Sequence, residues 1–130
     1  MNRFDATTRT DREALLVDGF EAHRDRGSPY CTVVAEADDP ETPDPWVQFD
    51  HGESMLNLDC SDAELERLDR FLAEVGGLTV AERRSPEEAE GTNVRMKAHV
   101  DHGRVAQLVE RLFREVYDRP ADYRLWVTEI

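Results

Sequence analysis

Residues 61–77 read SDAELERLDRFLAEVGG, and this stretch decides the fold class. Ser61 and Glu64 form a capping box, in which each side chain accepts a hydrogen bond from the free backbone N–H of the other residue. Large apolar residues then recur at steps of three, four and three, at Leu65, Leu68, Leu72 and Val75. Gly76 and Gly77 end the pattern. We therefore expect an amphipathic helix whose buried stripe contributes about 1.5 to 3 kcal/mol for each large apolar side chain.

Two more helices are predicted on the same grounds. Thr10 and Glu13 form a second capping box, and Gly27 supplies the left-handed residue that ends this helix. Its apolar face is expected to hold Leu16, Phe20 and His23, with the histidine partly buried and hydrogen-bonded. Asp101 is a good N-cap for the last helix, which Pro120 closes. The apolar face of that helix carries Val105, Leu108, Val109, Leu112, Phe113 and Val116.

The segments between these helices have the composition and alternation of strands. They span residues 30–36, 46–50, 54–59, 78–83 and 92–100. Segments 46–50 and 54–59 are expected to form a hairpin with His51 and Gly52 as turn residues, which places Asp50 opposite Glu53, Val47 opposite Leu56 and Gln48 opposite Met55. The core face of the hairpin is then Val47, Phe49, Leu56 and Leu58, and the other face is Trp46, Gln48, Met55 and Asn57.

Together these elements predict a single α+β domain over residues 1–130. It has an antiparallel sheet of about five strands and three helices, in the order α-β-β-β-α-β-β-α. Residues 1–8 are polar and expected to be flexible. The C-terminal cover segment 121–130 alternates weakly, so it is either a strand or an irregular cover.

The charge of the chain is strongly unbalanced. Twenty-nine acidic residues stand against sixteen basic ones, for a net charge of −13, and Lys97 is the one lysine among fifteen arginines. So many like charges oppose compaction, but in molar salt the screening length falls to about 3 Å. Apolar residues at regular spacing argue against a disordered acidic chain. The composition therefore predicts a halophilic protein.

The sequence also bears on the compartment. No signal peptide is recognisable, and the longest apolar run, residues 14–17, is far shorter than the roughly 20 residues that span a bilayer. Cys31 and Cys60 lack the spacing of a zinc or redox motif, so we expect both to be reduced and buried. A cytoplasmic location without membrane association is expected.

A cationic stripe is the candidate site. Arg95, Lys97 and His99 alternate along one predicted strand, and Arg83 lies on its neighbour. Such a stripe suits an anion or a docked acidic partner, and its alternative role is to balance the surrounding carboxylates. Trp46 is expected either to share this face with Met55 as an interaction hot spot or to be covered with it by the C-terminal tail, where Trp126 can pack.

Other chemistries find little support in the sequence. No nucleophile motif or glycine-rich phosphate loop is present, so no catalytic residue and no cofactor are predicted. His99, Asp101 and His102 are of metal-ligating types, but Asp101 is already needed as an N-cap, and no metal site is predicted. The net negative charge opposes nucleic-acid binding.

The order of elements over residues 10–118 resembles that of type III secretion chaperones and YbjN-like domains, small α+β proteins with helices against an antiparallel sheet. In composition and size the chain resembles small acidic haloarchaeal proteins of unknown role. The chaperone resemblance implies a homodimer that binds a segment of a protein partner without chemistry. The expected function is a noncatalytic protein-binding or chaperone-like module, and the alternative is a small-molecule or anion-binding domain, or a small enzyme, that uses the cationic strand face.

Overall fold

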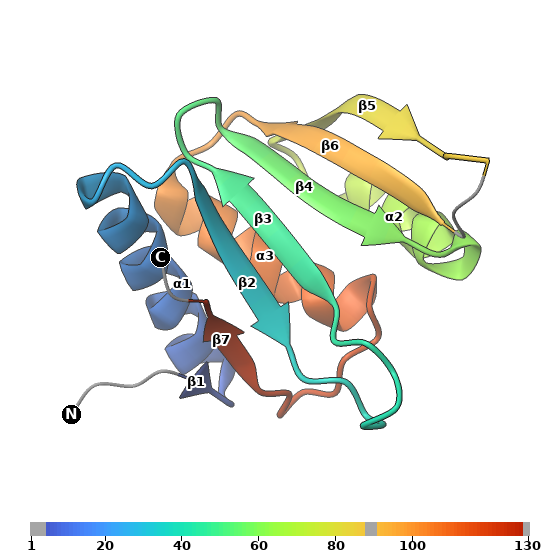
Figure 1. Cartoon of the computed structure of the whole chain (residues 1–130), viewed down its shortest axis with the longest axis horizontal. Helices are drawn as coiled ribbons and strands as arrows, with labels where there is room; N and C mark the ends of the chain where they lie inside the picture. Colours follow the sequence, from blue (N-terminus) through green and yellow to red (C-terminus); the bar gives the residue numbers. More distant parts are fainter. Residues whose placement is uncertain (1–4, 88–90, 129–130) are drawn as a thin grey trace.

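The computed structural model describes residues 5–87 and 91–128, in which three helices lie on one face of an antiparallel sheet (Figure 1). The strand order is β1-β7-β2-β3-β4-β6-β5. The central strands are β2 (Tyr30–Ala35), β3 (Trp46–Asp50), β4 (Met55–Cys60) and β6 (Thr92–Ala98), and β5 (Leu78–Arg84) is an edge strand. The predicted α+β class with an antiparallel sheet and three helices is confirmed.

The sheet has seven strands and not about five, because segments near both termini pair with it. β7 (Leu125–Val127) pairs with β2, and β1 (Asp5–Ala6) pairs with β7. The terminal segment 121–130 therefore contributes a strand within the sheet plane in place of a cover over it. Of segment 1–8, expected to be flexible, residues 1–4 lie outside the described residues, as do residues 129–130 of the terminal segment.

The helices are α1 (Arg9–Asp25), α2 (Asp62–Glu74) and α3 (His102–Glu115). The capping box of Ser61 and the N-cap Asp101 are confirmed. The cap predicted at Thr10 is wrong by two residues, because the Oγ1 of Thr8 accepts the backbone N–H of Asp11. Gly27, with φ of 72°, ends α1 as predicted. α3 ends at Glu115, before Pro120 is reached.

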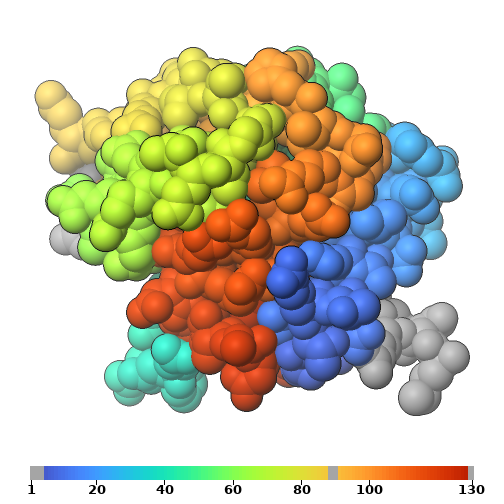
Figure 2. Space-filling view, turned by 180° about the vertical axis from the view of Figure 1, so that it is seen from behind, coloured from blue at the N-terminus to red at the C-terminus, as the bar shows by residue number. Residues whose placement is uncertain are grey.

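The helices cover the back of the sheet together. Figure 2 shows α3 between α1 and α2 on this face. Leu68 and Phe71 of α2 are buried, while Leu65 and Leu72 are half-buried. Phe71 extends the stripe that the spacing predicts. Among the described residues, no helix is both long enough and apolar enough to cross a membrane.

The register of the β3–β4 hairpin differs from the prediction by two residues. Gln48 lies opposite Asn57, not Met55, and Val47 lies opposite Leu58. The connection therefore has four residues, 51–54, and Ser54 adopts a left-handed φ of 55°. A shift of two residues leaves every side chain on its predicted face, because side chains alternate with period two. The predicted core face of the hairpin is thus confirmed.

A buried ion pair joins α1 to α3. Arg12 is 1% exposed and Glu110 is 0% exposed, and the Nε and Nη2 atoms of Arg12 lie 3.2 and 3.1 Å from Oε2 of Glu110. Arg12 also donates to the carbonyls of Thr7, Ala121 and Tyr123 at 2.8 to 3.0 Å. Both groups are therefore fully hydrogen-bonded in the interior, as buried charges require. The sequence analysis did not predict this pair.

Candidate functional site

The sheet face opposite the helices is uncovered, and we call its outward-pointing strand positions the open face (Figure 1). On the core side of the central strands the side chains are buried, whereas none on the open face is. The open face comprises Asp5, Tyr30, Thr32, Val34, Trp46, Gln48, Asp50, Met55, Asn57, Asp59, Thr79, Glu82, Arg84, Asn93, Arg95, Lys97 and Trp126. It is the one broad surface that secondary structure builds and leaves without a covering layer within the described ranges.

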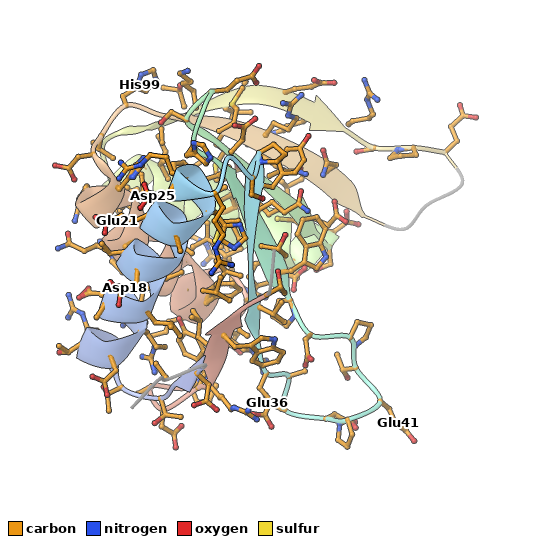
Figure 3. The ribbon with its side chains drawn as sticks, turned by 60° about the vertical axis from the view of Figure 1, so that its left-hand side comes forward. Asp18, Glu21, Asp25, Glu36, Glu41 and His99 are labelled. Atoms are coloured by element: carbon orange, nitrogen blue, oxygen red, sulfur yellow. The ribbon has the colours of Figure 1, made fainter. Side chains whose placement is uncertain are left out.

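The charge of the open face is close to balance. Its three cations, Arg84, Arg95 and Lys97, stand against four carboxylates, those of Asp5, Asp50, Asp59 and Glu82. The whole chain carries −13. Much of that charge is placed elsewhere: Asp18, Glu21 and Asp25 lie on the outer side of α1, away from the sheet (Figure 3). The open face therefore holds only a small share of the net negative charge of the chain.

Two tryptophans mark one end of the open face. Val34 of β2 lies opposite Trp46 of β3 on one side and opposite Trp126 of β7 on the other. The guanidinium carbon of Arg124 lies 5.6 Å from the centre of the Trp126 ring, a cation–π distance. We call Trp46, Val34 and Trp126 the tryptophan row. Because β7 continues the sheet beside β2, it does not cover Trp46 or Met55, so the predicted alternative of a covering tail is wrong.

A ladder of amide hydrogen bonds crosses the middle of the open face. Asn93 donates to Oδ1 of Asn57 at 2.8 Å, Asn57 donates to Oε1 of Gln48 at 3.3 Å, and Gln48 donates to Oγ1 of Thr32 at 3.3 Å. The four residues belong to β6, β4, β3 and β2. All the bonds run in one direction across the sheet, so each amide is oriented by its neighbour. We call these residues the amide ladder.

A shallow depression of about 310 Å³ lies on the open face beside the amide ladder. Its lining is Tyr30, Gln48, Asp50, Met55, Asn57, Asn93 and Arg95. Tyr30, 53% exposed, is one of only two large hydrophobic side chains in residues 5–87 and 91–128 that are exposed. The depression thus combines apolar surface, hydrogen-bonding amides, a carboxylate and a guanidinium.

The structure brings three of the predicted site residues to the open face. Arg95 and Lys97 lie on β6, and Trp46 lies two strands away on β3. Lys97 donates to the backbone carbonyl of Glu53, while the Arg95 guanidinium is 3.9 Å from the Glu53 carboxylate. His99 follows β6, where its Nε2 lies 2.9 Å from Oγ1 of Thr79.

Arg83 does not share this face with Arg95, contrary to the predicted stripe. A bulge between Val80 and Glu82 shifts the alternation of β5, so Arg83 lies opposite buried Val94 on the helix side. There its Nη2 is 2.5 Å from Asp69 of α2. Arg83 therefore connects the edge strand to a helix.

The amide ladder is not predicted from the sequence, because the predicted hairpin register is shifted by two residues. With Gln48 placed opposite Met55, the amides of Gln48 and Asn57 are out of alignment. A shift of the hairpin by two residues brings the two amides together and keeps the same core face. The signal that could have found the ladder is therefore the match of two amide side chains across a hairpin.

Both thiols and one histidine, His23, lie in the interior of the fold. Burial raises the pKa of Cys31 and that of Cys60 to about 12, so both thiols stay protonated near neutral pH. His23 is buried, with Nδ1 2.7 Å from the carbonyl of Tyr30, as its predicted role requires. In the part of the chain that the structure describes, no three His, Cys, Asp or Glu side chains gather closely enough to hold a metal ion. What the open face offers chemically is a set of hydrogen-bonding amides, cations and aromatic side chains.

The fold and the open face together define the class: an α+β protein with one sheet face covered by helices and the other left open, polar and partly aromatic. The chain belongs to the family described as "Family of unknown function (DUF7975)", which matches it over residues 1–130. Comparisons with curated proteins and with solved structures gave no match. The resemblance to secretion chaperones therefore stays a prediction from the order of elements.

Proposed function

We propose that this protein is a noncatalytic protein-binding module of a halophilic cytoplasm, and that its open face docks a second copy of the chain. The observation that carries the proposal is the near balance of charge on the open face in a chain with a net charge of −13. The sheet itself supplies a broad, rigid surface for such a contact.

Electrostatics favours a second copy over other occupants. In a two-fold symmetric dimer the same patch of each copy meets itself, so a strongly charged patch would repel its own image. A nearly neutral patch avoids this repulsion. A basic foreign partner would instead be drawn to segment 36–44, which carries five carboxylates and no cation.

The composition of the open face supports the same contact. Trp and Tyr are enriched at the centres of protein interfaces, since they bury a large area with few rotatable bonds. The tryptophan row and Tyr30 provide such groups, and the amide ladder provides hydrogen-bonding capacity between them. Arg95 and Lys97 add cations near the carboxylates of Asp50 and Glu82, which a rotated copy can pair with.

Light scattering after size exclusion in molar KCl tests this proposal. We expect the wild-type chain to elute with twice the monomer mass and Trp46→Glu, which adds a charge to the tryptophan row, to elute as a monomer. Gln107→Glu is the matched control, because it adds the same charge at an exposed position of α3 and should leave the dimer intact. Thermal unfolding of each variant confirms that it is folded.

Two outcomes would overturn the proposed occupant. One is a wild-type chain that stays monomeric over a wide concentration range. The other is a dimer that survives Trp46→Glu and is lost with Gln107→Glu, since the contact would then lie on the helix side. A purified foreign protein that binds the wild type but not Trp46→Glu would replace the second copy by a chaperone-like partner.

A further inference from the structure

The arginines of the sheet differ in how their charge is paired. Arg83 lies 2.5 Å from the carboxylate of Asp69, and Arg84 lies 3.0 Å from that of Glu82. Arg95, whose side chain is 42% exposed, has a carboxylate no nearer than 3.9 Å, on Glu53. Among arginines in the described strands, it alone lacks a carboxylate within hydrogen-bonding distance.

The strand register explains why Arg95 has no carboxylate within hydrogen-bonding distance. Glu82 lies directly opposite Arg95 on β5, where a cross-strand ion pair would normally form. Arg84 holds this carboxylate instead. On the other side Arg95 faces Asn57, which carries no charge. The guanidinium therefore lines the depression with its donors available.

The neighbouring amides also have donors to spare. In the described structure, Gln48 and Asn57 each use one of the two N–H groups of their amide within the ladder. These amides line the same depression as the Arg95 guanidinium. Tyr30 and Met55 add apolar surface to it. The depression therefore presents a fixed set of donors next to a surface on which a flat apolar group can rest.

From this arrangement we infer that the depression is a binding site for a small organic carboxylate with a planar, partly apolar body. A guanidinium fork matches a carboxylate in two parallel hydrogen bonds. A phosphate dianion fits less well, because Asp50 lines the depression and Asp59 accepts from Asn93 beside it. One guanidinium balances one negative charge.

This inference uses the same face as the proposed dimer but is tested apart from it. A docked second copy would cover the depression, so carboxylate binding is measured on the monomer, and the dimer is measured without carboxylate. Carboxylate binding by a chain that never dimerises would support the carboxylate site and contradict the proposed dimer. A chain that dimerises but binds no carboxylate as a monomer would support the dimer and contradict the carboxylate site.

Benzoate is the probe, with benzamide as its neutral counterpart of the same shape. In molar KCl, at protein concentrations low enough for monomer, benzoate should shift the NMR signals of the Gln48, Asn57 and Asn93 side-chain amides in a saturable way. We expect benzamide to bind at least about tenfold more weakly, because it is uncharged and has one acceptor oxygen in place of the two that a carboxylate presents to Arg95.

Variants assign the effect to Arg95. Arg95→Gln should weaken benzoate binding by at least about tenfold. Arg104→Gln, which removes the same charge from the exposed first turn of α3, should leave it unchanged. Lys97→Gln should have a smaller effect than Arg95→Gln, because Lys97 does not line the depression. Equal binding of benzamide and benzoate, equal loss in both arginine variants, or no saturable shift would overturn the inference.

Discussion

Two of the arginine–glutamate pairs in the described structure have surroundings that give them opposite roles. Arg12 and Glu110 are fully buried and joined by hydrogen bonds of 3.1 and 3.2 Å. Arg95 and Glu53 lie on the solvated side of the sheet, with 3.9 Å between their charged atoms. The first pair is an element of the fold, and the second leaves the Arg95 guanidinium open to other partners.

The difference follows from how many further contacts each pair makes. Glu110 also accepts two hydrogen bonds from Arg114, at 2.7 and 2.8 Å, and this raises the pKa of Arg114. The Arg12 guanidinium lies 3.9 Å from the centre of the Tyr123 ring. We call Arg12, Glu110, Arg114 and Tyr123 the buried cluster. Removing Glu110 leaves the Arg12 guanidinium in the interior without a carboxylate, whereas an exposed charge is simply solvated by water.

Salt should change the stability of the fold more than any single substitution does. It screens the repulsion between exposed charges and hardly screens the ion pairs of the buried cluster. When KCl is lowered from molar to millimolar, we expect the chain to unfold, because the screening length grows from about 3 Å to several times that value. Thermal melts followed by circular dichroism over a KCl series measure this. An unchanged melting temperature across the series would contradict the halophilic interpretation of the charge.

Within the buried cluster, Glu110→Gln should lower the free energy of unfolding by about 3 to 5 kcal/mol, because it leaves Arg12 charged and unpaired in the interior. Glu53→Gln is the matched control on the open face, with an expected change within about 0.5 kcal/mol. Urea unfolding in molar KCl measures both. Similar values for the two variants would mean that the buried and exposed pairs are energetically alike.

Alkaline pH should destabilise the covered side of the sheet through its thiols. Burial raises the pKa of Cys31 and of Cys60 from 9.0 to about 12, so their contribution is fully present below pH 9 and is lost as pH rises toward 12. At pH 10, one unit above the pKa of a thiol in the unfolded chain, each thiol should lower the free energy of unfolding by about 1.4 kcal/mol.

Urea unfolding between pH 8 and 11 tests whether the free energy of unfolding falls in this way. In the double variant Cys31→Ala and Cys60→Ala the decline should begin about one pH unit later, where tyrosine begins to ionise in the unfolded chain. Burial raises the pKa of Tyr117 and of Tyr123, so these two tyrosines still cause part of the loss of stability at high pH in the double variant. A double variant with the same decline as the wild type from pH 9 would rule out the thiols as its cause.

The smallest expected effect is that of Arg95→Gln on stability. The change should lie within about 0.5 kcal/mol, because the side chain is partly exposed and its one ion pair is long. The same variant is expected to lose carboxylate binding. A large loss of stability would mean that Arg95, like Arg12, is part of the fold.

The sequence predicts which side of each helix and strand is buried better than it predicts which residues lie opposite each other across the sheet. Hydrophobic spacing is set by which side of an element is buried, so the helices at Ser61 and Asp101 and the core face of the hairpin follow from it. A hairpin register shifted by two residues satisfies the same pattern, and in the observed register Ser54 ends a four-residue connection with a left-handed φ of 55°. The amide ladder depends on this register and was therefore missed.

Two other features, the bulge in β5 and the pairing of Arg12 with Glu110, cannot be predicted from hydrophobic periodicity. The bulge in β5 moves Arg83 to the helix side, and nothing in the alternation of residues 78–83 marks its position. Arg12 does continue the stripe of Leu16 and Phe20 one turn earlier, which is a signal for burial. Its partner Glu110 is 98 residues away, and only the packing of α1 on α3 brings them together.

NMR spectra recorded against protein concentration in molar KCl are the decisive test of the proposal that the open face is the contact surface of this protein. We predict that, as concentration rises, shifts and line broadening appear in the indole N–H signals of Trp46 and Trp126 and in the side-chain amides of Gln48 and Asn57, while α1, α2 and α3 stay unchanged. Changes confined to the helices, or spectra independent of concentration, would contradict it.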